Sequence, residues 1–233
     1  MALYSVLGWF LPTKIKTAFW NSFMLVFFRY LLHIVCGLKI EVRGEEHILK
    51  GQGAIYASRH QSELETYMIT SFVKGGATYI FKKELSYIPL FGWAVAAYGA
   101  IPIDRSGGSS AMKNMLNVAK IFLAKGRSIV IFPEGTRTKP GKIVPYKPGV
   151  AFLYQNLDAT IIPVAHNTGL FWKKRSFLKY PGKIIFEFMP PIEKNLDKKD
   201  FMDKLRDAIE TKCNEINRET VKNYPYTEKF IEK

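Results

Sequence analysis

The sequence predicts a single α/β domain with a largely parallel mixed sheet flanked by helices, preceded by a membrane-associated helical segment. Three observations support this prediction. From residue 39 on, short apolar runs alternate with longer amphipathic segments, an order typical of strands that are connected through helices. Four of the apolar runs end in polar or proline-containing turns, and residues 1–28 carry only two charged side chains.

Residues 1–38 form the expected membrane-associated segment. Residues 1–13 and 17–28 are uncharged, and Arg29 interrupts the run that follows them. Neither stretch reaches the roughly 18 residues of a clean spanning helix, so we expect an aromatic-rich helical hairpin in the membrane interface. A single span over residues 17–38 that tolerates Arg29 and an ordinary buried helix are the alternatives. No secretory signal peptide is expected, because no cleavage pattern follows a basic start.

Residues 39–233 are expected to form one domain of alternating strands and helices. The apolar runs predict strands over residues 39–42, 54–58, 77–81, 100–103, 128–132, 160–165 and 183–189. The periodic segments predict helices over residues 62–73, 89–98, 110–125, 149–156 and 199–220.

Local signals mark where several of these elements begin and end. The Ser-x-x-Glu pattern at residues 62–65 is typical of a helix start. Pro89 suits the first turn of a helix and Gly99 its end, and Gly126 follows the next helix as a stop. Because the carboxyl ends of parallel strands share one edge of a sheet, the polar residues after the strands are expected to lie on one rim.

Composition restricts the classes of protein to consider. At 233 residues the chain is long enough to bury one sizeable core without disulfides. Cys36 and Cys213 are far apart, and the four histidines are scattered, so neither a metal site nor a cofactor is expected. This cysteine usage favours a reducing compartment.

The net charge of +14 indicates an anionic partner. The basic residues are spread along the chain, and no nucleic-acid motif accompanies them. Together with a hydrophobic content of 48%, this charge favours an anionic membrane surface over nucleic acid.

His60 and Glu65 stand out as a candidate base and its carboxylate partner. They lie in the sequence RHQSELE, at the expected turn from a strand into a helix. A neutral imidazole can accept a proton from a hydroxyl when a carboxylate holds its other nitrogen. The alternative is structural: a glutamate at this position can simply cap the helix by accepting the backbone N–H of Ser62.

Four sequence blocks decide between these interpretations. They read RHQSELE, GAIPIDR, IFPEGTR and IIPVAHN, in this order between residues 59 and 167. Together they resemble the motif blocks of the glycerolipid acyltransferases, most closely those of the bacterial 1-acyl-sn-glycerol-3-phosphate (lysophosphatidate) acyltransferases. The chain departs from the family pattern at Glu65, where the family usually has aspartate. The longer side chain keeps the chemistry of the pair and changes its reach.

The resemblance implies roles for particular residues. His60 would be the general base and Glu65 its partner. Residues expected to bind the acceptor phosphate and its surroundings are Lys83, Arg105, Glu134, Gly135, Thr136 and Arg137, with Lys82 as the alternative to Lys83. Pro163 and Asn167 match a block linked to the acyl donor side or to sheet integrity. His166 matches no base of the family and is expected to be structural.

The resemblance implies transfer of a fatty acyl group from a thioester to the free hydroxyl of lysophosphatidate, giving phosphatidate. Acyl-CoA and acyl-carrier protein remain open as donors. The expected location is the cytoplasmic face of a membrane, the inner membrane in a bacterium. Acylation of another lysolipid, such as lyso-ornithine lipid, is one alternative. A non-catalytic basic protein that binds anionic lipid or nucleic acid is the other.

Overall fold

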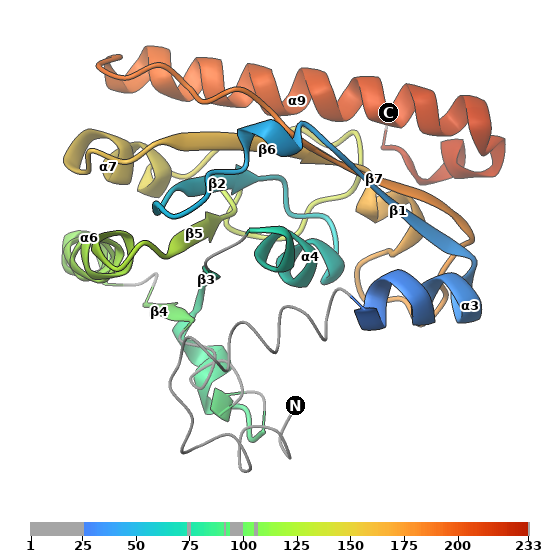
Figure 1. Cartoon of the computed structure of the whole chain (residues 1–233), viewed down its shortest axis with the longest axis horizontal. Helices are drawn as coiled ribbons and strands as arrows, with labels where there is room; N and C mark the ends of the chain where they lie inside the picture. The colour runs from blue at the N-terminus through green and yellow to red at the C-terminus, as the bar shows by residue number, and fades with distance from the viewer. Residues whose placement is uncertain (1–25, 74–75, 91, 94–99, 105–106, 233) are drawn as a thin grey trace.

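The computed structural model describes residues 26–73, 76–90, 92–93, 100–104 and 107–232. Its centre is one seven-stranded sheet (Figure 1), and all seven predicted strands are confirmed. The strands are β1 (Leu38–Arg43), β2 (Ile55–Ser58), β3 (Ala77–Lys82), β4 (Ile101–Ile103), β5 (Ser128–Ile131), β6 (Ile161–His166) and β7 (Gly182–Phe188).

The strand order is β1-β7-β6-β2-β5-β3-β4. Neighbouring strands pair in parallel everywhere except between β6 and β7, which are antiparallel. The predicted largely parallel mixed sheet is therefore confirmed. Five strands, from β6 to β4, point the same way, so the segments that follow them meet at one edge of the sheet.

Helices cover both faces of the sheet, as Figure 1 shows with α9 along one side and α4 and α3 on the other. The α-helices are α3 (Leu32–Cys36), α4 (Leu64–Phe72), α6 (Gly108–Ala124), α7 (Gly149–Asn156), α8 (Thr168–Phe171) and α9 (Lys198–Asn223). Shorter turns are the π-helix η1 (Phe27–Leu31) and the 3-10 helices η2 (Glu45–His47), η3 (Lys83–Tyr87) and η4 (Pro225–Phe230).

Each face has its own apolar core. Side chains of α4 and α8, such as Met68 and Phe171, pack on one face, and side chains of α6, α7 and α9, such as Met115 and Leu205, pack on the other. Every residue of β2 and β5 is buried. This explains why the two strands are continuous apolar runs rather than alternating ones, since neither face meets water.

Four of the five predicted helices are confirmed, and one lies mostly outside the described residues. That helix was expected over residues 89–98, of which 91 and 94–98 are not described. Pro89 and Leu90 form a turn, and Leu90 has a left-handed φ of 65°. The short helix α8 was not predicted, because four residues are too few to show a helical period.

The predicted N-terminal hairpin over residues 1–38 lies outside the described residues up to residue 25. Its described end is helical, through η1 and α3, and stops at Gly37, which has the left-handed φ of 66° that favours glycine. Among the described residues, no helix combines the length and the apolar character needed to cross a bilayer.

Candidate active site

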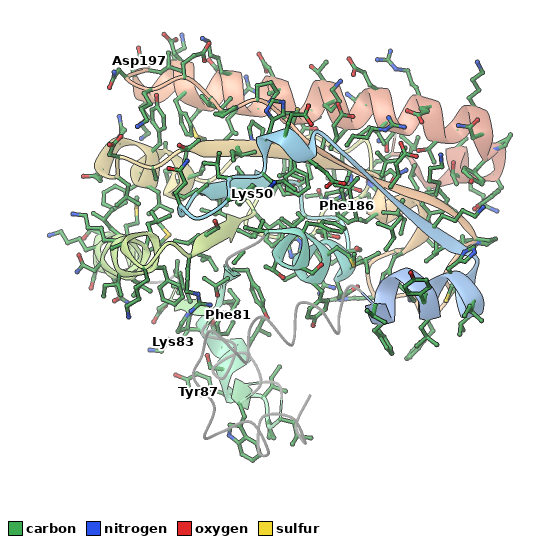
Figure 2. All side chains as sticks on the ribbon, viewed as in Figure 1. Lys50, Phe81, Lys83, Tyr87, Phe186 and Asp197 are labelled. Atoms are coloured by element: carbon green, nitrogen blue, oxygen red, sulfur yellow. The ribbon has the colours of Figure 1, made fainter. Side chains whose placement is uncertain are left out.

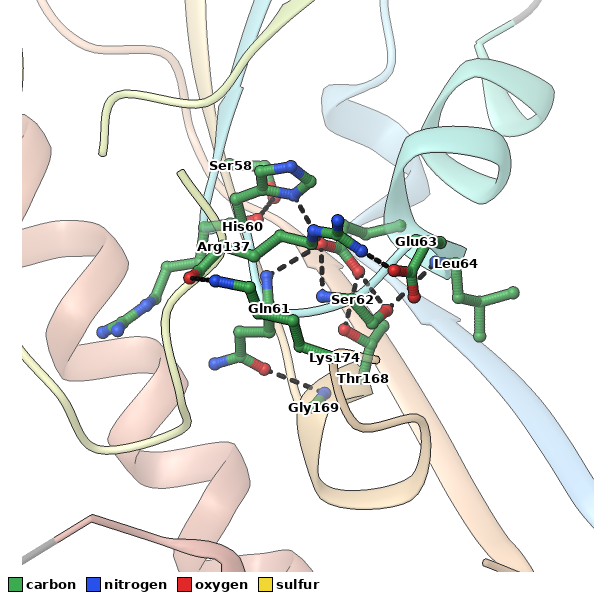
Figure 3. Close-up of polar contacts among 12 residues, drawn as sticks. Ser58, His60, Gln61, Ser62, Glu63, Leu64, Arg137, Thr168, Gly169 and Lys174 are labelled. Atoms are coloured by element: carbon green, nitrogen blue, oxygen red, sulfur yellow. Dashed lines mark hydrogen bonds and ion pairs between the residues drawn. The ribbon is translucent and has the colours of Figure 1, made fainter. Parts of the chain in front are cut away.

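The first residues of the candidate site lie where β2 ends and α4 begins. His60 follows β2 by two residues, and Glu65 is the second residue of α4. The Nδ1 atom of His60 lies 2.9 Å from Oε1 of Glu65. His60, Ser62 and Thr168 are seen around this contact in Figure 3. The structure therefore brings the two predicted catalytic residues together.

Glu65 caps the helix and holds His60 at the same time. Its Oε1 atom also accepts the backbone N–H groups of Gln61 and Ser62, at 2.8 and 2.7 Å. Its Oε2 atom accepts the hydroxyls of Ser62 and Thr168, at 2.5 and 2.9 Å. The two interpretations of the Ser-x-x-Glu pattern are thus compatible, because the same oxygen, Oε1, accepts both the backbone N–H of Ser62 and a hydrogen bond from the His60 ring.

These donors keep Glu65 ionised although it is completely buried. Burial alone would raise the pKa of its carboxyl group, but the hydrogen bond from His60 and the other donors outweigh it and lower the pKa to about 2. A carboxylate that is charged at neutral pH stabilises a positive charge on the neighbouring imidazole. It also fixes Nδ1–H as the donor, which leaves the lone pair of Nε2 to accept a proton.

The backbone of His60 is fixed by the loop that follows β5. The N–H of His60 donates to Oε2 of Glu134 at 2.8 Å, and its carbonyl accepts the N–H of Thr138 at 2.7 Å. The ring stacks on Phe132, with 4.1 Å between centroids. Since the His60 side chain is only 20% exposed, one edge of a tightly held ring remains open to a substrate.

A second buried charge cluster lies behind the base. Arg59 is 1% exposed and forms ion pairs with both Glu134 and Glu210. It also donates to the Thr138 hydroxyl at 3.1 Å and to the carbonyl of Lys142. One guanidinium thus serves two carboxylates. Burial, opposed by Arg59 and reinforced by Glu210, raises the pKa of Glu134 to about 7.

A pocket of about 540 Å³ opens beside His60. Its wall is largely aromatic and aliphatic. Its polar side is formed by residues just before α4, at the end of β3 and in the loop after β5. The lining residues include Tyr67, Tyr79, Phe81, Leu85, Ile88 and Phe132 on the apolar wall, and Glu63, Lys82, Thr136 and Arg137 on the polar side. The pocket can therefore accommodate a ligand with one apolar and one anionic end.

Arg137, one of the residues expected to bind the acceptor, lies at the polar side of the pocket. Its guanidinium forms an ion pair with Glu63 of the RHQSELE block, and its carbonyl accepts the Lys174 ammonium at 3.0 Å (Figure 3). Partial burial and the nearby Arg175 lower the pKa of Arg137. An anion entering the pocket would relieve the repulsion between the two arginines.

Only some of the other residues predicted to bind the acceptor line the pocket. Gly135 and Thr136 line the pocket, and Gly135 has a φ of 68°, which a side chain would disfavour. Glu134 is buried behind His60 rather than in the pocket wall. Lys82 lines the pocket, whereas Lys83 is exposed at the start of η3 (Figure 2). Arg105 lies outside the described residues.

His166 and Asn167, at the end of β6, support the site through buried hydrogen bonds. His166 is fully buried, donates from Nε2 to the carbonyl of Arg59 at 2.9 Å and accepts the N–H of Thr168. Burial lowers its pKa and keeps it neutral, which fits the structural role expected of it. Asn167 bridges to β7 by accepting the N–H of Ile185 at 2.9 Å.

Sequence reasoning missed three supporting residues: Arg59, Thr168 and Glu210. Arg59 and Thr168 stand within or directly after quoted blocks, so their position was a signal. A polar residue at the carboxyl end of a parallel strand often faces the site. Glu210 sits on α9 among many charged residues, and nothing local distinguishes it. In the part of the chain that the structure describes, no three His, Cys, Asp or Glu side chains are grouped to hold a metal ion.

A base held by a buried carboxylate, beside a pocket with one apolar and one cationic side, is suited to activating a hydroxyl for attack. The profile of the acyltransferase family matches residues 39–167 of the chain. The chain belongs to this family. All four sequence blocks that carry the resemblance fall inside the matched range.

Two curated relatives show the extent of the similarity. The 1-acyl-sn-glycerol-3-phosphate acyltransferase of Pseudomonas aeruginosa is 38% identical over 155 residues, which cover 66% of this chain and 60% of the relative. The protein of the same name from Limnanthes douglasii is 31% identical over 196 residues, which cover 84% of this chain and 66% of the relative. The chain thus spans somewhat less than two thirds of the length of these relatives.

A solved structure has the same fold. The 1-acyl-sn-glycerophosphate (LPA) acyltransferase PlsC from Thermotoga maritima superposes with a TM-score of 0.67 and 19% sequence identity. The superposition covers 92% of this chain and 95% of that chain. At this identity the similarity establishes the fold alone.

Proposed function

We propose that the chain transfers a fatty acyl group from an acyl thioester, acyl-CoA or acyl-carrier protein, to the free hydroxyl of lysophosphatidate, giving phosphatidate. The observation that carries this proposal is the His60–Glu65 pair at a pocket that joins an apolar wall to a cationic end. The relatives named after this activity support the choice of acceptor.

The proposed reaction needs one base and no covalent enzyme intermediate. Nε2 of His60 accepts the hydroxyl proton as the hydroxyl oxygen attacks the thioester carbonyl. Glu65 stabilises the imidazolium that forms, because it is ionised and bonded to Nδ1. The tetrahedral intermediate then collapses, the C–S bond breaks, and the thiolate leaves with the proton that His60 returns. The new ester and the free thiol are the products.

The two ends of the pocket suggest how the acceptor is oriented. Arg137 provides a planar, permanently charged donor suited to a phosphate monoester. Tyr79, Phe81 and Ile88 provide an apolar surface for an acyl chain. A lysolipid with its phosphate at Arg137 would have its glycerol hydroxyl beside His60, because both side chains line the same pocket.

Removal of the Arg137 charge tests the acceptor assignment. In Arg137→Ala the KM for lysophosphatidate should rise by a factor that corresponds to about 2–4 kcal/mol, while the KM for acyl-CoA changes little. Lys139→Ala, an exposed cation two residues away, is the matched control and should behave as wild type. An equal rise in both KM values would remove Arg137 from the acceptor site.

An acceptor screen separates the proposed substrate from its alternatives. Purified full-length protein with labelled acyl-CoA should acylate lysophosphatidate faster than glycerol-3-phosphate or zwitterionic lysolipids. Preference for an amino-acid-based lysolipid would favour the lyso-ornithine alternative. Absence of transfer to any acceptor, with acyl-CoA and acyl-carrier protein as donors, would favour a non-catalytic lipid-binding protein.

We also propose that residues 1–38 hold the enzyme on the cytoplasmic face of a membrane. The described part of this segment supports the proposal, since Ile34 is 79% and Val35 is 70% exposed on α3. The protein should sediment with anionic vesicles and be released by detergent, while high salt alone only weakens the binding. Complete release by salt would contradict an apolar anchor.

A further inference from the structure

The segment between α8 and β7 presents a feature that the proposed reaction does not use. Residues 173–179, here called the 173–179 loop, have the sequence KKRSFLK. Phe177 at its tip is fully exposed, and Leu178 is 66% exposed. Two adjacent apolar side chains in water, within a run of cations, indicate a surface that is covered by something else.

The 173–179 loop is held in a defined shape. The N–H of Ser176 donates to the carbonyl of Lys173 at 3.2 Å, and the N–H of Leu178 donates to Oγ of Ser176, also at 3.2 Å. A bridge between Trp172 and Lys179 closes the base of the loop. The exposed apolar tip is therefore presented by a structured turn, which reduces the entropy cost of docking it.

Cation–π contacts fix two of the loop's lysines to the domain. The Lys179 ammonium lies 4.3 Å from the Trp172 ring, and the Lys173 ammonium lies 4.1 Å from the Phe230 ring. Arg175 lies close enough to Arg137 for its charge to contribute to lowering the pKa of Arg137. Lys179 also donates to the carbonyls of Ser176 and Phe177, so this cation lies next to the apolar tip.

The 173–179 loop lies between the exposed end of α3 and the mouth of the pocket. On one side the N–H of Gly182 donates to the carbonyl of Gly37, directly after α3, at 3.1 Å. On the other side Lys174 donates to the carbonyl of Arg137. The loop is therefore bonded to the candidate acceptor site through Lys174, and the chain that follows the loop is bonded to the end of α3, the helix that exposes Ile34 and Val35.

Charge identifies the kind of surface that fits the loop. The loop carries four cations, Lys173, Lys174, Arg175 and Lys179, and no acidic residue occurs between Asp158 and Glu187. Each cation near an anionic bilayer strengthens binding to it, and an aromatic side chain adds to this by entering the interface. A fully exposed phenylalanine beside an apolar helix suits a bilayer better than the polar surface of an acidic protein.

We propose that the 173–179 loop docks on an anionic lipid bilayer, with Phe177 and Leu178 in the interface, and sets the mouth of the pocket beside Arg137 at headgroup level. This inference rests on the proposed function only for the identity of the lipid that enters there. Contact of the loop with the bilayer does not depend on acyl transfer.

A fluorescent probe at the tip tests the docking. In full-length protein with Cys36→Ser, Phe177→Cys is labelled with an environment-sensitive dye, and vesicles of phosphatidylcholine with added phosphatidylglycerol are titrated in. Emission should rise about twofold or more and shift to shorter wavelength, and nitroxide-labelled lipid should quench it. Ile121→Cys on α6, also exposed, is the control and should not respond.

Two further variants test whether the charge of the loop contributes to the binding of vesicles. Arg175→Ser should weaken the titration of the tip probe roughly fivefold, whereas Lys199→Ser should leave it unchanged. No response at position 177 with vesicles, or a response only to an acidic acyl-carrier protein, would overturn the proposal. If the probe responds but no acyl transfer is measured, the docking stands and the proposed function fails. If transfer is normal without a response, the docking alone fails.

Discussion

Glu65 and Glu134 are two buried glutamates that flank the same histidine, yet their environments drive them in opposite directions. Glu65 contacts the ring of His60 and has a pKa of about 2, whereas Glu134 contacts the backbone of His60 and has a pKa of about 7. Burial penalises both carboxylates. Glu65 accepts five hydrogen bonds. Glu134 accepts two, from the N–H of His60 and the hydroxyl of Thr138, and shares the single guanidinium of Arg59 with Glu210.

The comparison shows that the number of donors, rather than burial, decides which carboxylate can assist a base. Glu65 is charged at neutral pH and able to stabilise an imidazolium. Glu134 titrates near neutrality and can hold the backbone in either protonation state, since one of its oxygens accepts an N–H in both. We infer that Glu65 serves the reaction and that Glu134 serves the architecture.

The largest expected effect comes from removal of the charge at Glu65. In Glu65→Gln the amide oxygen can still accept the N–H groups of Gln61 and Ser62, so the helix should form. Turnover should nevertheless fall by about 10²–10⁴-fold, because a neutral amide cannot stabilise the imidazolium. The measurement is kcat together with a melting curve. His60→Ala should lose as much, and Glu65→Asp should retain more. A folded Glu65→Gln enzyme with near-normal kcat would refute the pair.

The next largest effect concerns Arg59. Arg59→Ala leaves Glu134 and Glu210 buried without their cation, which should cost about 3–5 kcal/mol of stability. The control is Glu210→Gln, which leaves Arg59 paired with Glu134 and should lose less. Chemical denaturation at neutral pH measures both. Equal stability of the two variants would mean that the arginine is not what holds this cluster together.

The smallest effect is expected from Glu134→Gln. Because the folded pKa of Glu134 is raised from 4.5 to about 7, its contribution to stability is present at low pH and is lost as pH rises through this window. The loss amounts to about 3 kcal/mol, and it should vanish in Glu134→Gln, which resembles the protonated acid. Glu65 has the opposite sign: its contribution is lost as pH falls from 4.5 toward 2.

Glu134→Gln also tests whether Glu134 has an architectural role or binds the acceptor. Glu134→Gln should leave kcat and the acceptor KM within a few-fold of wild type, since the glutamine oxygen still accepts the N–H of His60. The resemblance assigns Glu134 to acceptor binding instead. A strong rise in the acceptor KM, with an unchanged pH dependence of stability, would favour that assignment over the architectural one.

Much of the fold could be predicted because its signals are local. The seven strands are apolar runs closed by turn residues, and the pairing of His60 with Glu65 follows from their spacing across a strand-to-helix turn. The antiparallel placement of β7 was not predictable, because it depends on contacts such as that of Asn167 with Ile185. The Arg59–Glu210 pair joins residues 151 positions apart, and no local pattern reports such a contact.

The loop after β5 forms two hydrogen bonds with the backbone of His60. These bonds limit how the site can be engineered. Glu134 and Thr138 bind the N–H and the carbonyl of the base, so any change of loop length intended to admit a new headgroup would also displace the reacting nitrogen. Leu85 and Ile88 belong to the segment after β3 and share no such bond with His60. Under the proposed acyl transfer, the apolar wall is therefore the part of the pocket to redesign first, because changes there leave the hydrogen bonds to His60 in place.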